Sequence, residues 1–96
     1  MKLTSLDMAV AKAMFLHGTA RSMVLADVKP YSTDWSHGGP IIEREGIELR
    51  KSYGDDGERD GWTAQAWAHN TTIFEHGPTP LIAAMRCFVS CSLGSF

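Results

Sequence analysis

Residues 79–94 read TPLIAAMRCFVSCSLG and predict a C-terminal helix. Thr79 can cap this helix through its side-chain oxygen, Pro80 suits the first helical position, and Gly94 can end the run. Arg86 and Ser90 fall on one side of the helix, and the opposite side is an apolar stripe. The stripe consists of Leu81, Ile82, Met85, Phe88, Val89 and Leu93. We expect this helix to lie across a sheet and to supply the largest share of the core.

Alternating segments upstream predict that sheet. In residues 47–53, apolar and polar side chains alternate with a period of two, which is typical of a half-buried strand. Residues 54–61, GDDGERDG, form a charged turn. Residues 62–68 alternate again, so the two segments should pair as an antiparallel hairpin. A third stretch, residues 71–74, either extends the sheet or remains a loop.

The N-terminal half adds two helices and a strand. Residues 5–17 carry one apolar stripe at helical spacing, and Gly18 can end that helix. Residues 23–28 are apolar and β-branched enough for a short strand. Pro40 suits the first position of a short helix over residues 40–45, after a segment rich in turn formers.

The chain is therefore predicted to be one α+β domain over residues 1–96. It has an N-terminal helix, a short central helix, and an antiparallel β-hairpin or small sheet packed by the C-terminal helix. Nine basic and eleven acidic residues argue against nucleic-acid binding, because proteins that neutralise several phosphates carry a basic excess. The longest uncharged apolar stretch, residues 78–85, is far short of the ~20 residues of a membrane span. We expect a cytoplasmic protein that binds no membrane.

The cysteine and histidine spacing is weak for a metal centre. Cys87 and Cys91 are four residues apart in the helical pattern, a spacing that rarely suits a disulfide, so both should be reduced. Together with His76 they could bind zinc, but such sites usually use a short C-x-x-C spacing. Two small apolar side chains on a helix flank explain the same pattern.

Two further patterns have simple structural explanations, and no cofactor is predicted from them. Gly38-Gly39-Pro40 could offer backbone N–H groups to an anion, but a tight turn into the helix accounts for it better. The charged turn could suggest calcium, but the bidentate glutamate at position twelve of a calcium loop is missing. Its acidic residues are Asp55, Asp56, Glu58 and Asp60.

A polar site and an aromatic surface both remain open. Asp34, His37 and Arg86 could meet in the fold, although Asp34 capping a turn and Arg86 facing solvent or pairing with it is the simpler interpretation. Trp62 and Trp67 should point to opposite faces of their strand, so at least one is partly exposed unless another segment covers it. Exposed aromatic side chains mark interaction surfaces. The aromatic residues that carry most information are Tyr31, Trp35, Trp62, Trp67 and Phe74.

Two blocks of the sequence are long and specific: residues 31–47 read YSTDWSHGGPIIEREGI, and residues 79–88 read TPLIAAMRCF. These blocks resemble the NinX-like proteins of lambdoid and related phages. The resemblance runs from the first helix to Gly94, with departures in residues 17–28 and in the hairpin loop. It implies a phage or prophage accessory protein in the cytoplasm of a bacterial host, and it supplies no catalytic residues.

Two functional hypotheses follow. In the first, the protein is not an enzyme and presents an aromatic surface to a host or phage protein, or to a second copy of itself. Inhibition of a host or defence factor is one form that this binding could take. In the second, a small ligand-binding or enzymatic domain uses Asp34, His37 and Arg86. The residues expected to form the interaction surface are Tyr31, Asp34, Trp35, Trp62, Trp67 and Arg86.

Overall fold

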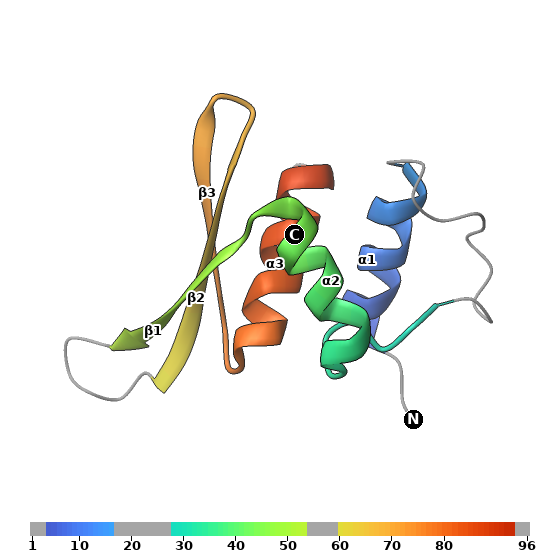
Figure 1. The fold of residues 1–96 in the computed structure, drawn as a ribbon, viewed down its shortest axis with the longest axis horizontal. Helices are drawn as coiled ribbons and strands as arrows, with labels where there is room; N and C mark the ends of the chain where they lie inside the picture. Colours follow the sequence, from blue (N-terminus) through green and yellow to red (C-terminus); the bar gives the residue numbers. More distant parts are fainter. Residues whose placement is uncertain (1–3, 17–27, 54–59, 94–96) are drawn as a thin grey trace.

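The computed structural model describes residues 4–16, 28–53 and 60–93. Its three strands pair antiparallel in the order β1-β2-β3, and α3 packs on the sheet, so the predicted α+β class is confirmed (Figure 1). The elements are α1 (Ser5–Leu16), α2 (Trp35–Glu45), β1 (Glu48–Tyr53), β2 (Asp60–Ala68), β3 (Thr71–Gly77) and α3 (Pro80–Leu93).

The helix α3 lies in the middle of the described chain. The sheet packs on one side of it, and α1 and α2 pack on the other (Figure 1). Thr79 caps the helix as predicted, because its hydroxyl oxygen accepts the Ile82 N–H at 3.1 Å. Ser90, which the sequence places on the side opposite the apolar stripe, is buried and donates to the Glu75 carboxylate at 2.7 Å. A helix covered from two directions buries residues outside its apolar stripe.

The two faces of the sheet have different surroundings. Trp62, Ala64 and Ala66 point toward α3, and Ala64 is fully buried. Because side chains alternate along a strand, Thr63, Gln65 and Trp67 lie on the opposite face. The described helices all lie on the α3 side of the sheet (Figure 1). No described helix or strand therefore covers the opposite face, which we call the outer face.

The third predicted stretch is a strand, and it extends to Gly77. A two-residue turn joins it to β2, and both turn residues have positive φ, His69 at 54° and Asn70 at 62°. Two consecutive left-handed residues are the geometry of a type I′ hairpin. The His69 Nε2 atom lies 2.8 Å from the Cys91 carbonyl oxygen, so the turn contacts the last turn of α3.

The helix α2 begins at Trp35 rather than at Pro40, so the predicted start is wrong. Asp34 is its N-cap, and the carboxylate accepts the Ser36 N–H at 2.9 Å. Gly46 ends the helix in the left-handed conformation. Pro40 lies inside the helix and has no backbone N–H, so the Ser36 carbonyl one turn earlier lacks its helical donor. Ser36 is exposed, and its carbonyl can bond water instead.

The first helix is confirmed where the structure describes it. Leu6, Val10 and Ala13 of the predicted stripe are buried. The predicted end of this helix at His17 and Gly18 lies outside the described residues. So does the predicted strand over residues 23–28, apart from Val28, which belongs to no strand.

Candidate functional site

Two large aromatic side chains are exposed on the outer face. Trp67 on β2 is 71% exposed and Phe74 on β3 is 54% exposed. In the register of the sheet, Trp67 stands opposite Thr72 and Phe74 stands opposite Gln65, so the two rings are diagonal neighbours. We call the patch formed by Gln65, Trp67, Thr72 and Phe74 the aromatic face.

Polar pairs border the aromatic face. The Gln65 amide donates to the Glu48 carboxylate on β1. Farther along the sheet, the Thr63 hydroxyl lies 2.9 Å from the His76 Nδ1 atom. An apolar centre within a polar rim is the arrangement found in protein–protein interfaces.

The other tryptophans do not join this patch. Trp62 is half-buried on the α3 side, with the Lys51 Nζ atom 5.8 Å from its ring centroid, so the prediction of opposite faces for Trp62 and Trp67 is confirmed. Trp35 is 52% exposed but lines a hollow with Pro80 at the start of α3. Trp67 lies near Cys91 at the other end of that helix. Fourteen helical residues span about 21 Å, so Trp35 and Trp67 belong to separate surfaces.

Tyr31 is buried, and the expectation that it lies on an exposed surface is wrong. The side chain is 7% exposed and belongs to the core, where its ring meets the His37 ring edge-on at 6.4 Å between centroids. Burial raises the pKa of the Tyr31 hydroxyl. The segment before α2 turns inward here because Gly38 lets the helix approach the Tyr31 carbonyl closely.

The polar residues of the second hypothesis have separate partners. The Asp34 carboxylate accepts hydrogen bonds from the Ser36 hydroxyl and N–H, which lower its pKa, and the nearby His37 lowers it further. Arg86 donates from Nη1 to the His76 carbonyl oxygen of β3 at 2.8 Å. Among the described residues, no hydrogen bond joins Arg86 to Asp34 or His37. The structure therefore gives no indication that the three side chains converge.

The residues of the disfavoured zinc site are also apart. His76 pairs with Thr63 on the outer face, whereas Cys87 is buried on the α3 side and donates weakly to the Ile73 carbonyl oxygen. Burial raises the pKa of the Cys87 thiol to about 12, and both cysteines are free. Within residues 4–16, 28–53 and 60–93, no three metal-binding side chains cluster. Three acidic residues of the charged turn lie outside those ranges: Asp55, Asp56 and Glu58.

The proposed anion contact at Gly38-Gly39-Pro40 is wrong, and so is the tight turn preferred for it. These residues lie inside α2, and the Gly38 N–H already donates to the Asp34 carbonyl at 2.9 Å.

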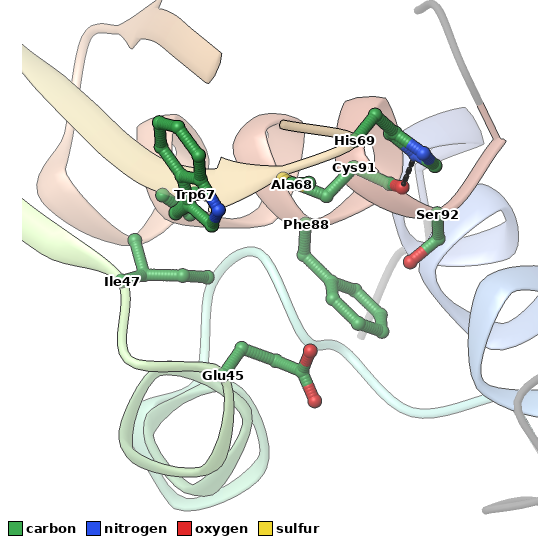
Figure 2. Close-up of a pocket in the computed structure, with 9 residues that line it drawn as sticks. Glu45, Ile47, Trp67, Ala68, His69, Phe88, Cys91 and Ser92 are labelled. Carbon is green, nitrogen blue, oxygen red and sulfur yellow. Dashed lines mark hydrogen bonds between the residues drawn. The ribbon is translucent and has the colours of Figure 1, made fainter. Parts of the chain in front are cut away.

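The sheet supplies a different concave feature. A hollow of about 240 Å³ opens beside the end of β2 and is lined mainly by apolar side chains, as Figure 2 shows. Its walls come from Ile47, Ala66, Trp67, Phe88 and Cys91, with Glu45, His69 and Ser92 at the side.

Sequence reasoning does not assign Phe74 or this hollow to the functional surface. Exposed and less exposed side chains alternate along residues 71–77, and this alternation places Phe74 on the exposed face of the strand. The hollow has no such signal, because it arises where α2, β2 and α3 meet. Chemistry at this surface would rest on apolar contact and backbone groups, since the nearby cysteine thiols have raised pKa values.

Comparison with known proteins places the chain in a family. No helix among the described residues is long and apolar enough to cross a membrane. No curated protein matches the sequence. A family model described as bacteriophage P22, NinX matches residues 23–91, which include β1, β2, β3 and α2 in full and most of α3. The match covers well over half of the 96-residue chain, and the protein belongs to this phage NinX family.

Proposed function

We propose that this phage protein is a non-enzymatic accessory protein that binds a host or phage protein through its aromatic face. The observation that carries the proposal is the 71% exposure of Trp67 on a sheet face that no described element covers. Removal of apolar surface from water favours association, and the Trp67 indole and the Phe74 phenyl ring are the large exposed apolar groups of this face.

The arrangement of the aromatic face supports protein recognition. Tryptophan is among the residues most often found at the energetic centre of protein interfaces, and it loses little conformational freedom on binding. The strands that carry Trp67 and Phe74 are held from behind by α3, so a partner would meet a surface that is already ordered. The polar pairs around the patch can exclude water from its rim.

The non-enzymatic part of the proposal is supported by the engagement of the polar side chains. Asp34 serves as the cap of α2, and Arg86 bonds a backbone carbonyl of β3. Both groups therefore have structural partners, although the buried Arg86 Nε has none among the described residues. We propose that the protein acts in the host cytoplasm, and that covering a functional surface of a host or defence factor is its mode of action.

Affinity purification from infected cells tests this proposal. A tagged wild-type chain should recover a defined partner, identified by mass spectrometry, and Trp67→Ala should recover at least about tenfold less. Phe74→Ala should act in the same direction. Phe15→Ala is the matched control, because Phe15 is an aromatic residue of α1 that is 42% exposed and remote from the sheet face. Circular dichroism should show that all the variants are folded.

Two results would contradict the proposal. One is equal recovery of the partner by Trp67→Ala and by Phe15→Ala. The other concerns the phenotype that the wild-type protein gives to the phage. If Trp67→Ala keeps this phenotype while Asp34→Asn and His37→Ala each abolish it, the ligand-binding or enzymatic alternative is favoured. Trp35→Ala tests the separate surface at the start of α3, and on our proposal it leaves recovery unchanged.

A further inference from the structure

The strand β2 extends past the end of its neighbour β1. The first residue of β1 is Glu48, which stands opposite Gln65. Beyond that point, Trp67 and Ala68 pair only with β3. The chain before β1 leaves the sheet, because α2 ends at the left-handed Gly46 and the Ile47 N–H donates to the Ile42 carbonyl of that helix at 3.1 Å. No described strand therefore lies beside Trp67 on the β1 side.

The register determines where the backbone groups of Trp67 point. Ala68 and Thr71 close the two-residue turn, so their N–H and C=O groups face each other. Facing and non-facing pairs alternate along antiparallel strands, so the Trp67 N–H and C=O point away from β3, to the β1 side. The same alternation turns the His76 carbonyl to the outer edge of β3, where Arg86 donates to it, which supports the assignment independently.

The hollow described above adjoins this unpaired edge. Phe88 and Ile47 are buried and form its apolar wall, and Figure 2 shows Trp67 above Ile47 with Glu45 and Phe88 below. Its volume of about 240 Å³ is below the roughly 300–1,000 Å³ of pockets that hold drug-sized ligands. The hollow is therefore of a size for one or two side chains. We call the hollow together with the unpaired Trp67 edge the notch.

We propose that the notch binds an extended segment of the partner protein. The partner's backbone bonds the N–H and C=O of Trp67, and an adjacent aliphatic side chain of leucine, isoleucine or methionine size fills the hollow. An unpaired donor and acceptor on one strand residue are matched by another extended backbone, whose alternating side chains then reach the pocket beside it. The Glu45 carboxylate lies at the side of the hollow, where one of its oxygens accepts from Arg44 Nε at 2.9 Å, and its second oxygen favours a basic residue next to that aliphatic side chain.

This inference rests on the proposed function and states which part of the partner binds: an extended segment with one aliphatic side chain. Nuclear magnetic resonance titration of the full chain tests it directly. The probe is a seven-residue peptide with acetylated and amidated ends, a central leucine, a lysine directly beside the leucine, and threonines at the other positions. We expect a dissociation constant on the order of 1 mM. The amide shifts should be largest at Ala66, Trp67 and Ala68.

Two control peptides separate the backbone contact from the side-chain contact. N-methylation of both residues that flank the leucine removes the peptide donor, and binding should weaken about three- to tenfold. Replacement of the leucine by alanine removes the group that fills the hollow, and binding should weaken at least about tenfold. Equal binding of the parent and N-methylated peptides would overturn the proposal.

Protein variants provide the matching controls. Ser92→Leu places an apolar side chain in the hollow from the end of α3 and should abolish peptide binding, whereas Ser36→Leu on exposed α2 should not. Ala66→Leu fills the hollow from β2 and should act as Ser92→Leu does. Glu45→Gln should weaken binding of the lysine peptide about twofold, and Glu43→Gln, which lies outside the hollow, should leave it unchanged.

The outcomes distinguish this inference from the proposed function. Ser92→Leu leaves the Trp67 and Phe74 side chains in place, so on our proposal it loses the partner together with the peptide. If Ser92→Leu retains the partner while Trp67→Ala loses it, the notch assignment fails and the aromatic face stands. If sedimentation shows a wild-type dimer that Ser92→Leu converts to a monomer, the occupant is a second copy of this chain, and the proposal is overturned.

Discussion

At the scale of single residues, Asp7 connects two segments that are distant in sequence. Its side chain is fully buried and accepts hydrogen bonds from the Thr4 N–H at 2.9 Å, the Ser32 N–H at 2.8 Å and the Ser32 hydroxyl at 2.7 Å. The Thr4 hydroxyl in turn accepts the Asp7 N–H at 3.1 Å. One carboxylate thus caps α1 and holds the turn that leads to α2.

Replacement of Asp7 should be costly. Asp7→Asn keeps the shape but puts an NH₂ group, which cannot accept, in place of one carboxylate oxygen. We expect a loss of about 2–3 kcal/mol in the free energy of unfolding at neutral pH, because at least one buried donor is left unpaired. Urea denaturation measures this loss. Glu43→Gln, the same change from a carboxylate to an amide at an exposed position, is the control for the general effect of substitution.

The same residue predicts an acid dependence of stability. Burial alone raises the pKa of Asp7, but the hydrogen bonds from Thr4 and Ser32 outweigh it, and the folded pKa lies below the ordinary value of 3.8. The ionised group therefore stabilises the fold fully above pH 3.8, and this contribution is lost as the pH falls through the lower folded pKa. The difference in stability between wild type and Asp7→Asn should shrink as the pH falls below 3.8. A difference that stays constant down to pH 2 would contradict this assignment.

At the scale of elements, the start of α2 is determined by packing contacts rather than by local sequence preferences. Gly38 and Gly39 are poor helix formers and Pro40 suits the first helical position, so sequence patterns begin the helix at Pro40. The observed helix includes all three because Gly38 lets it approach the Tyr31 backbone and the Leu81 side chain. A contact between distant segments has no local signal, and neither did the burial of Tyr31.

The two glycines of α2 should respond in opposite directions. A Cβ at Gly38 would overlap the Tyr31 carbonyl oxygen, so Gly38→Ala should destabilise the chain by about 1–3 kcal/mol. A Cβ at Gly39 would lie 3.9 Å from the Trp35 ring, an ordinary contact, so Gly39→Ala should stabilise the helix by about 0.5–1 kcal/mol. Thermal unfolding measures both. The same sign for the two variants would contradict the observed start of α2.

The turn between β2 and β3 gives a second prediction at this scale. Asn70 has a φ of 62°, which glycine adopts without strain and alanine does not. Asn70→Gly should raise the free energy of unfolding by up to about 1 kcal/mol, and Asn70→Ala should lower it by a similar amount. In a domain of this size, each 1 kcal/mol shifts the midpoint of thermal unfolding by roughly 4–8 °C. If both variants shift the midpoint downward equally, the type I′ assignment fails.

Sequence patterns predict some elements of this fold well. The apolar stripes and caps that define α1 and α3 are local, and so is the alternation that defines β1 and β2. They could therefore be recognised without the structure. The burial of Ser90 could not be, because it depends on α3 being covered by the sheet and by two helices at once.

At the scale of the whole molecule, the layers follow one order: the sheet, then α3, then α1 and α2 (Figure 1). This order leaves the outer face of the sheet without a described cover. Period-two alternation predicts that Trp62 and Trp67 face opposite ways, but it does not say which of them α3 covers. The packing of α3 against the Trp62 side decides this, so Trp67 rather than Trp62 lies on the outer face.

The central claim is that the outer face of the sheet, together with the notch beside Trp67, meets the partner, whereas the exposed side of α1 does not. Site-specific photocrosslinking in infected cells tests it most directly, with Phe74→p-benzoylphenylalanine on the aromatic face and Phe15→p-benzoylphenylalanine on α1 as the control. Both changes replace one exposed aromatic ring by another. We predict a light-dependent adduct of defined mass from the variant at position 74 and none from the variant at position 15. Absence of an adduct at position 74, or equal adducts at both positions, would contradict the account.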